Sequence, residues 1–232
     1  MSVSDAVNKV LVSDLGQVIL PFDTARVWSA LLPLSRLPEA ATRSTVQQIV
    51  RETGLGRGGV TGAEFHRRVA AATGIDLDYA GFRNAWSDMF ELNQGVLRLI
   101  REISCARRVL LSNTNALHWE FITQKFPEIL ELFDDLCVSH EIGSEKPDPE
   151  IYAWVERLTG AAPQAHLFVD DIPIYVEAAR SRGWDAVLFT GTRMFANDLR
   201  TRGFLVTDDD FGDACVRVTE SSQALWDTGP GR

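Results

Sequence analysis

The sequence predicts an α/β protein in which a doubly wound parallel sheet carries a helical insertion, called the cap below. Downstream of residue 95, short apolar runs alternate with segments of helical periodicity, as strands and helices do around a parallel sheet. One further apolar run stands near the N-terminus, and residues 23–94 behind it have helical periodicity and no convincing strand. We therefore expect a core made of residues 1–20 and 95–232, with residues 21–94 forming the cap.

The first predicted strand covers residues 9–13. Its apolar part, Val10-Leu11-Val12, is short and contains two β-branched residues, which is typical of a parallel strand buried on both faces. Asp14 follows it directly, and the chain then runs to Pro21, where the cap is expected to begin.

The cap is expected to be helical throughout. Residues 61–64, Thr-Gly-Ala-Glu, have the form of a capping box, with a hydroxyl at the N-cap and a glutamate three residues later. The glycine-rich stretch 54–59 lacks the Lys-Ser/Thr ending of a phosphate-binding P-loop, so it is interpreted as a flexible turn. Trp28 and Trp86 are expected to pack inside the cap rather than to line a pocket.

Four more strands and three more helices are predicted after the cap. The expected strands are residues 108–111, 136–139, 166–169 and 186–189. Apolar residues at helical spacing predict helices around residues 96–103, 151–158 and 174–182. Asp148-Pro149 has the form of an N-cap followed by proline at the first helical position, and Gly160 is a signal for the helix end. The tail beyond residue 204, with Asp208-Asp209-Asp210, receives no assignment.

Composition and charge exclude several classes of partner. The chain is 45% hydrophobic and 24% charged, as is ordinary for a globular protein. Its net charge of −9 argues against binding to nucleic acid or to an anionic membrane, because either needs a basic surface. Cys105, Cys137 and Cys215 lack metal-like spacing and are expected to be reduced thiols. With no signal-peptide start and no apolar stretch of membrane-spanning length, a cytoplasmic monomer or homodimer is expected.

Acidic residues follow two of the predicted strands. Asp14 ends the first, and Asp170 with Asp171 ends the strand at 166–169. Because ligands of open parallel sheets bind at the carboxyl ends of strands, these carboxylates are expected to hold Mg²⁺, a cation that prefers oxygen ligands. One oxygen of Asp14 would then be free to attack phosphorus. The alternative is that each aspartate caps a turn, although adjacent carboxylates repel unless a cation compensates.

A hydroxyl and an ammonium complete the predicted site. Ser112 precedes Asn113-Thr114-Asn115, so its hydroxyl and the backbone amides are expected to meet a phosphate at a helix N-terminus; the alternative is an N-cap serine without a ligand. Lys146 lies in a loop that Pro147 and Pro149 stiffen. It is expected to hold phosphate and nucleophile together as a point charge, and the alternative is an isolated surface lysine.

Taken in order, these stretches resemble the haloacid dehalogenase-like hydrolase superfamily, whose members are mostly phosphatases. The matching stretches are residues 12–18, 110–115, 145–148 and 168–171. The resemblance implies a Rossmann-like core with a helical cap inserted after the first strand. Residues 14–18, Asp-Leu-Gly-Gln-Val, are similar to the Asp-Leu-Gly-Asn-Val of a subgroup that includes sugar-phosphate phosphatases such as a glucose-1-phosphatase.

The resemblance also implies a role for each site residue. Asp14 is implied to be the nucleophile that forms an aspartyl-phosphate with a small phosphorylated substrate, and Lys146 to stabilise the phosphate. Ser112 and the amide of Asn113 are implied to bind the phosphate. The implied Mg²⁺ ligands are Asp14, the carbonyl of Gly16 and Asp171, with Asp170 in or beside the metal shell.

Gly16 departs from the superfamily pattern. The usual phosphatase has an aspartate there, which protonates the leaving group and then activates water, and such general acid–base catalysis typically contributes about 10²–10⁴-fold. Three outcomes stay open: a cap residue such as Glu64 or His66 replaces the aspartate; the substrate has a good leaving group, such as an anomeric or acyl phosphate; or the protein is a catalytically weak phosphate-binding or regulatory protein.

Smaller departures follow the acidic pair. Ile172 and Tyr175 stand where superfamily members often have asparagines, which is expected to alter the contacts around the metal. The metal-free dehalogenase branch, in which an aspartate attacks carbon, is a further alternative, but the paired carboxylates of Asp170 and Asp171 favour a cation. His118 is expected at a helix surface.

Overall fold

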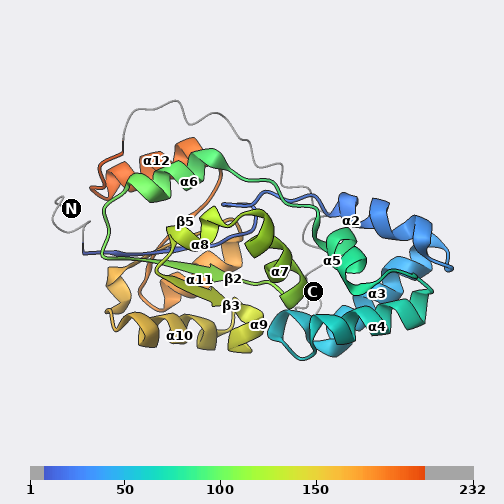
Figure 1. Cartoon of the computed structure of the whole chain (residues 1–232). Coiled ribbons are helices and arrows are strands. Elements are labelled where there is room, and N and C mark those ends of the chain that lie inside the picture. The colour runs from blue at the N-terminus through green and yellow to red at the C-terminus, as the bar shows by residue number, and fades with distance from the viewer. Residues whose placement is uncertain (1–7, 207–232) are drawn as a thin grey trace.

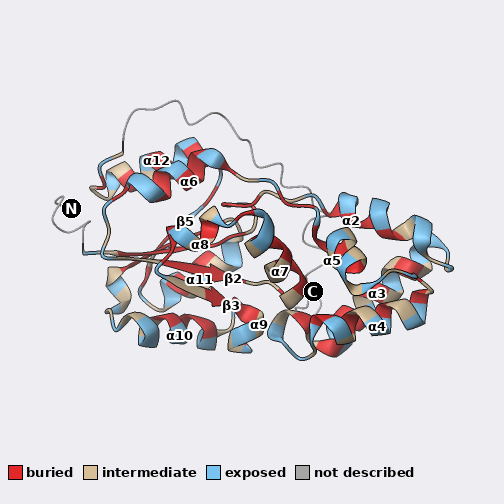
Figure 2. Cartoon of the chain, viewed as in Figure 1, coloured by how far each residue is buried: buried red, intermediate tan, exposed pale blue. Residues whose placement is uncertain are grey.

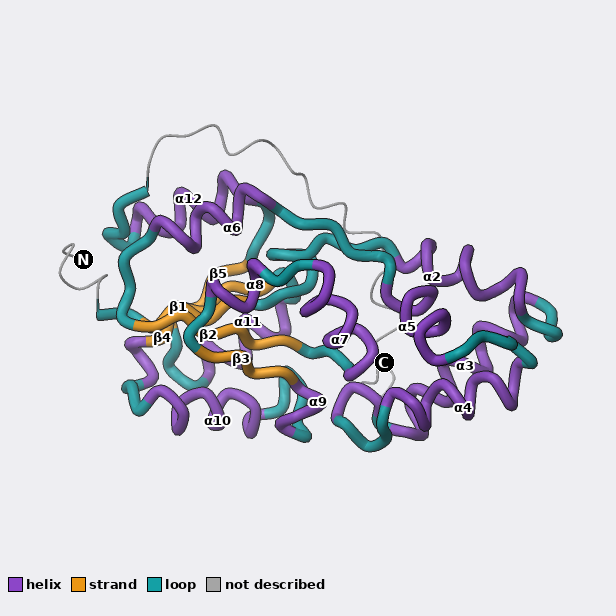
Figure 3. Tube along the Cα trace, viewed as in Figure 1, coloured by secondary structure: helices purple, strands orange, loops and turns teal. Residues whose placement is uncertain are grey.

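The computed structural model describes residues 8–206 and contains one parallel sheet of five strands. The strands, in the spatial order β3-β2-β1-β4-β5 (Figures 1 and 3), are β1 (Val10–Ser13), β2 (Arg107–Ser112), β3 (Asp135–Val138), β4 (His166–Asp170) and β5 (Asp185–Leu188). Each predicted strand is found to within one residue at either end. The chain builds the sheet outward from β1 in one direction and then, through β4, in the other, so the predicted doubly wound α/β fold is confirmed.

Helices cover both faces of the sheet (Figure 1). Outside the cap segment, those in the described residues are α6 (Gln94–Glu102), α7 (Ala116–Lys125), α8 (Glu128–Leu132), α9 (Ser139–Ile142), α10 (Pro149–Thr159), η3 (Pro163–Ala165), α11 (Pro173–Ser181) and α12 (Thr192–Thr201). The predicted helices correspond to α6, α10 and α11. Gly160 ends α10 in the left-handed conformation, as expected.

Side chains alternate between the two faces along β1. Val10 and Val12 point into one apolar cluster, where Tyr152 and Val155 of α10 also pack. Leu11 points into the other cluster, which continues through α6, α7 and α12 into the cap. Burial on both faces explains why this strand consists of apolar residues in sequence.

The segment between β1 and α6 consists of helices, shown in blue to green on the right of Figure 1. They are α2 (Thr24–Leu31), η1 (Leu32–Leu34), α3 (Glu39–Thr53), η2 (Leu55–Arg57), α4 (Gly62–Thr73) and α5 (Tyr79–Ser87). The hydroxyl of Thr61 accepts a hydrogen bond from Glu64 N and caps α4, as predicted. Trp28 and Trp86 are buried, also as predicted. We propose that this segment, residues 21–94, is a cap distinct from the core of residues 1–20 and 95–232.

Helix α5 of the cap packs on α7 of the core. The His118 ring stacks on Trp86, with ring centroids 5.9 Å apart, and its Nδ1 lies 3.0 Å from the hydroxyl of Ser87. His118 is therefore buried at this contact, and its expected position at a helix surface is wrong. The hydroxyl of Tyr79 donates to the Glu120 carboxylate at 2.8 Å at the edge of the same contact. Figure 2 shows buried residues on the facing sides of these helices.

Among the described residues, no helix combines the length and the apolar character needed to cross a bilayer. The tail that the sequence left unassigned, including Asp208-Asp209-Asp210, lies outside the described residues.

Candidate active site

The predicted carboxylates lie at the carboxyl edge of the sheet, between β1 and β4. Ser13 is paired in register with Val169, so the residues that follow them, Asp14 and Asp170, stand on neighbouring strands. One carboxylate oxygen of each of Asp14, Asp170 and Asp171 lies within 4.8 Å of the others. This edge is the switch point of the doubly wound sheet, where such folds bind their ligands.

Lys146 reaches into the centre of this acidic cluster. Its Nζ donates to Asp14 Oδ1 and to Asp170 Oδ2, each at 2.6 Å, and to the carbonyl of Leu111 at 3.1 Å. The side chain is almost fully buried, so the alternative of an isolated surface lysine is wrong. The ammonium holds one oxygen of Asp14 and leaves the other oxygen outside this contact.

Burial shifts the proton affinities of the cluster. It raises the pKa of Asp170 to about 7 even though Lys146 is bonded to that carboxyl. Burial, together with the nearby Asp14 and Asp170 carboxylates, raises the pKa of Asp171 to about 8. Burial alone would lower the pKa of Lys146, but the two carboxylates it contacts raise it above the usual value, so Lys146 is an ammonium.

The donor set fits a hard divalent cation. Three carboxyl groups face a single ammonium in this cluster, so a divalent cation would balance the charge of the three ionised carboxylates and favour their ionised forms. Carboxylate oxygens in this number suit Mg²⁺, which takes few protein ligands and keeps several waters. Asp14 and Asp171 are the carboxylates best able to hold it, because both oxygens of Asp170 already accept hydrogen bonds, from Lys146 Nζ and from Ile172 N.

Asn113 fixes the backbone of Lys146. Its side-chain Oδ1 accepts from Lys146 N at 2.8 Å, and its Nδ2 donates to Lys146 O at 2.9 Å. The Tyr175 hydroxyl lies 3.4 Å from the same Nδ2, and the Tyr175 ring centroid lies 5.2 Å from Lys146 Nζ. The Asn113 side chain thus fixes the Lys146 backbone, and the predicted phosphate contact of Asn113 concerns its backbone amide.

Ser112 is the last residue of β2 and is buried beside this cluster. The N-cap of α7 is Asn115, whose side chain accepts from His118 N at 3.2 Å. The alternative of Ser112 as the N-cap of this helix is therefore wrong. Ser112 directly precedes Asn113, at the carboxyl end of β2.

Gly16 lies in a tight turn after β1. Its carbonyl accepts from Val18 N at 2.6 Å, so this predicted metal ligand already has one partner. A Cβ at Gly16 would lie 3.8 Å from Asp14 Oδ2 but only 3.1 Å from Cε1 of Phe22. A side chain at Gly16 would therefore press against the Phe22 ring.

The two cap residues considered as substitutes for an acid at Gly16 are engaged elsewhere. Glu64 pairs with Arg67 and Arg68 on its own helix. His66 contacts the carbonyl of Leu77 through Nε2 at 2.9 Å and stacks on Phe82. Among the described residues, no hydrogen bond or ion pair joins either to the acidic cluster.

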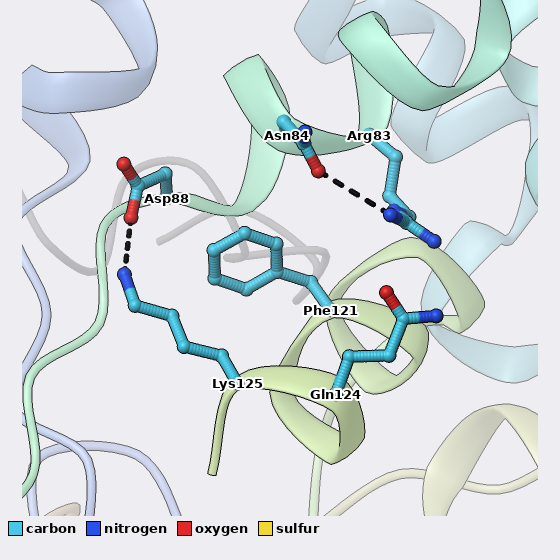
Figure 4. A pocket seen from close by; sticks show the side chains of 6 residues that line it. All are labelled: Arg83, Asn84, Asp88, Phe121, Gln124 and Lys125. Carbon is cyan, nitrogen blue, oxygen red and sulfur yellow. Dashed lines mark hydrogen bonds and ion pairs between the residues drawn. The ribbon is translucent and has the colours of Figure 1, made fainter.

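A cavity of about 400 Å³ lies at the contact of α5 with α7 (Figure 4). Its lining residues are Arg83, Asn84, Asp88, Phe121, Gln124 and Lys125. Lys125 pairs with Asp88 across it at 2.5 Å. None of these residues belongs to the acidic cluster, so this cavity is separate from the predicted site.

Phe22 was not predicted as part of the site, and Tyr175 was predicted only as a departure from the superfamily pattern that alters the contacts around the metal. Tyr175 lies in the first turn of α11, four residues after Asp171, and helical spacing places such a residue back toward the helix start. That spacing was a usable signal. Phe22 carries no such signal, because its position depends on how the cap meets the core.

Comparison with known proteins agrees with this geometry. No protein-family model matches the chain. The chain is 29% identical over 191 residues to a D-ribitol-5-phosphate phosphatase of Bacteroides thetaiotaomicron, covering 76% of this chain and 89% of that protein. A HAD family enzyme from the same organism has a similar structure, with a TM-score of 0.72 and 25% identity over 78% of this chain and 93% of that one.

The same HAD enzyme has also been solved in complex with magnesium and inorganic phosphate, and that structure gives a TM-score of 0.69 at 23% identity. Fold, order of the site residues and sequence similarity confirm the predicted resemblance of the chain to the haloacid dehalogenase-like hydrolases.

Proposed function

We propose that this protein is a magnesium-dependent phosphatase that hydrolyses a small phosphorylated metabolite, in the class of sugar or sugar-alcohol phosphates. The observation that carries the proposal is the buried contact of Lys146 with both Asp14 and Asp170 at the switch point, with Asp171 beside them. The similarity to a ribitol-5-phosphate phosphatase supports the substrate class. The similarity also favours an active phosphatase over a phosphate-binding or regulatory protein.

In the proposed reaction Asp14 is the nucleophile. Lys146 holds Oδ1 of Asp14 at 2.6 Å, which fixes the carboxylate so that its other oxygen points at the phosphorus. Attack forms the bond from Asp14 to phosphorus and breaks the bond from phosphorus to the substrate oxygen, which takes a proton from water and leaves as the alcohol. A second water then attacks the phosphorus of the aspartyl-phosphate, which frees Asp14 and releases inorganic phosphate. Mg²⁺, held by Asp14, Asp171 and the Gly16 carbonyl with Asp170 beside it, would neutralise charge on the phosphoryl group.

The phosphate is proposed to lie between Lys146 and the end of β2. The Ser112 hydroxyl and the Asn113 amide would donate to its oxygens, and the Lys146 ammonium would offset their charge. Asn113 contributes a second time, because its side chain holds the Lys146 backbone at 2.8 and 2.9 Å. We propose a cytoplasmic location and a monomeric or homodimeric state for the protein.

The test is phosphate release from a panel of sugar and sugar-alcohol phosphates, with and without Mg²⁺. We expect turnover that needs Mg²⁺ and falls on the order of a thousandfold or more in Asp14→Asn, since loss of a nucleophile removes the chemical step. A matched control is Asp23→Asn, which changes an aspartate that caps α2 in the cap. A wild type no faster than Asp14→Asn on every substrate would contradict the proposal.

A further inference from the structure

One loop of the cap contacts the core next to the acidic cluster. This loop, residues 54–59, contains η2 and packs on α9, so it is more than the flexible turn its glycines predicted. The buried hydroxyl of Ser139 donates to the Gly56 carbonyl at 2.6 Å and accepts from Thr114 N at 2.9 Å. A Cβ at Gly58 would lie 2.1 Å from the carbonyl oxygen of His140, so the two backbones meet where only glycine fits.

Arg57 extends from this loop to the turn that carries Lys146. The turn runs from Glu145 to Asp148 and is closed by a hydrogen bond from Asp148 N to Glu145 O at 2.8 Å. Arg57 Nε donates to Glu145 Oε2 at 3.0 Å, and its Nη1 lies 2.7 Å from Asp148 Oδ2. One planar guanidinium therefore bridges the first and the last residue of the turn.

This bridge replaces a helix cap. Asp148 stands at the N-cap position of α10, as predicted, but its side chain makes no capping hydrogen bond there. Its carboxylate is directed to Arg57 instead. An aspartate at an N-cap ordinarily accepts hydrogen bonds from the first backbone amides of its helix. Asp148 lacks that local contact and instead forms an ion pair with Arg57 of the inserted segment.

Lys146 is consequently held from two sides. Asn113 holds its backbone from the core through two hydrogen bonds, and Arg57 braces the residues on either side of the Lys146-Pro147 pair from the cap. The ammonium at the end of this side chain then meets Asp14 and Asp170.

We propose that Arg57 is a positioning residue that couples docking of the cap on α9 to the placement of Lys146 between Asp14 and Asp170. With the loop away from α9, the turn loses both ion pairs of Arg57 and keeps its two hydrogen bonds to the Asn113 side chain. The site is then complete only while the cap covers it, so that binding which closes the cap also assembles the catalytic groups. The consequence for turnover rests on the proposed phosphatase function; the coupling itself is a property of the free protein.

The experiment therefore reads the turn without substrate. Amide hydrogen exchange of peptides covering residues 143–150 is measured for wild type, Arg57→Met, Arg57→Lys and the control Arg67→Met, an exposed cap arginine that pairs with Glu64 on its own helix. We expect Arg57→Met to speed exchange in the turn roughly fivefold, the scale of a partly exposed ion-pair network. Arg57→Lys should recover part of the protection, because an ammonium bonds to one carboxylate at a time, and Arg67→Met should match wild type.

A second pair of variants separates cap docking from backbone strain. Gly54 and Gly58 both have positive φ, +57° and +69°, but a Cβ at Gly54 meets nothing within 4 Å while one at Gly58 meets the His140 carbonyl. We expect Gly58→Ala to loosen the 143–150 peptides as Arg57→Met does. Gly54→Ala should leave their exchange unchanged.

Turnover supplies the remaining readout. Arg57→Met should lower kcat by a similar factor, roughly fivefold, with a smaller change in KM, because Arg57 acts on Lys146 and not on the substrate. Unchanged exchange in Arg57→Met, or equal effects of the two glycine variants, would overturn the coupling. A wild type without phosphatase activity, in which Arg57→Met still loosens the turn, would overturn the proposed function and support the coupling.

Discussion

The Phe22 ring is the nearest neighbour of any side chain introduced at Gly16. A Cβ at Gly16 would point toward Asp14 Oδ2, 3.8 Å away, but would meet the Phe22 ring at 3.1 Å. Phe22 in turn packs edge-on against Phe90, with ring centroids 5.9 Å apart. A carboxyl added at Gly16 alone would therefore crowd the Phe22 ring, which must shift by a few tenths of an ångström to admit it. The site as it stands has no acid at this position, so an alkyl phosphate is expected to be hydrolysed more slowly than with an aspartate there.

The substitutions Gly16→Asp and Phe22→Ala should raise kcat more in combination than either does alone. On an alkyl phosphate such as a sugar-alcohol phosphate, Gly16→Asp with Phe22→Ala should raise kcat by about 10²-fold, the lower end of general acid–base catalysis. Gly16→Asp alone should give a much smaller gain, and Phe22→Ala alone none. On an acyl phosphate, whose leaving group is already a weak base, the three variants should be about equal to wild type.

These rates are measured as kcat on one alkyl and one acyl phosphate at equal Mg²⁺. An increase in kcat of about 10²-fold in Phe22→Ala alone would contradict this prediction. The gain would then come from the larger space beside Asp14 and not from proton transfer by a carboxyl group.

The polar residues of the site could be predicted from the sequence. Asp14, Ser112 and Asp170 each come at the end of an apolar strand, and parallel strands present these ends at one edge of the sheet. The structure brings all three to that edge together with Lys146. Phe22 and Arg57 carry no comparable pattern, because their contacts depend on the placement of the cap and not on local sequence.

At the scale of elements, the contact of α5 with α7 joins cap to core through a buried histidine. Burial lowers the pKa of His118 to about 3 from its usual 6.5, so the folded protein holds the neutral imidazole. The unfolded chain binds a proton below about pH 6.5 and the folded chain does not. Stability from this group is therefore complete at pH 7 and is lost as pH falls toward 3.

Replacement of His118 should flatten the acid side of the stability curve. Between pH 7 and pH 5 this one group should cost wild type about 2 kcal/mol of unfolding free energy. In His118→Gln the difference between the two pH values should shrink by that amount, although the variant is less stable at pH 7. Urea denaturation at both pH values checks this, with His66→Gln, a partly exposed cap histidine, as the control. An undiminished pH dependence in His118→Gln would show that His118 is protonated in the folded protein.

Strands were easier to predict than helices in this chain. Each strand is a compact apolar run such as Leu110-Leu111, which burial on two faces requires. Helix α12 was missed because its N-cap is Gly191, without a side-chain cap, and its apolar face consists only of Phe195, Ala196 and Leu199. For helix α7 the sequence predicted only a helix start after Ser112, and in the structure the N-cap residue is Asn115.

For the whole molecule, one apolar cluster runs from the sheet into the cap. It includes Leu11 of β1, Phe121 of α7 and Phe65 of α4, so cap and core are not independently packed in this arrangement. The sequence predicts a helical insertion after the first strand but not how it sits on the core. That placement depends on contacts between distant residues, such as Trp86 with His118 and Arg57 with Glu145.

Binding of Mg²⁺ by the acidic cluster is the central claim, and calorimetric titration of the protein with Mg²⁺ and then with inorganic phosphate tests it most directly. We predict that one Mg²⁺ binds to wild type, that Asp171→Asn weakens it more than about tenfold, and that phosphate binds only after Mg²⁺. Asp185→Asn, which alters an aspartate paired with Arg202 away from the cluster, should bind as wild type does. Equal Mg²⁺ affinity in wild type and Asp171→Asn, or no Mg²⁺ binding at all, would contradict the account.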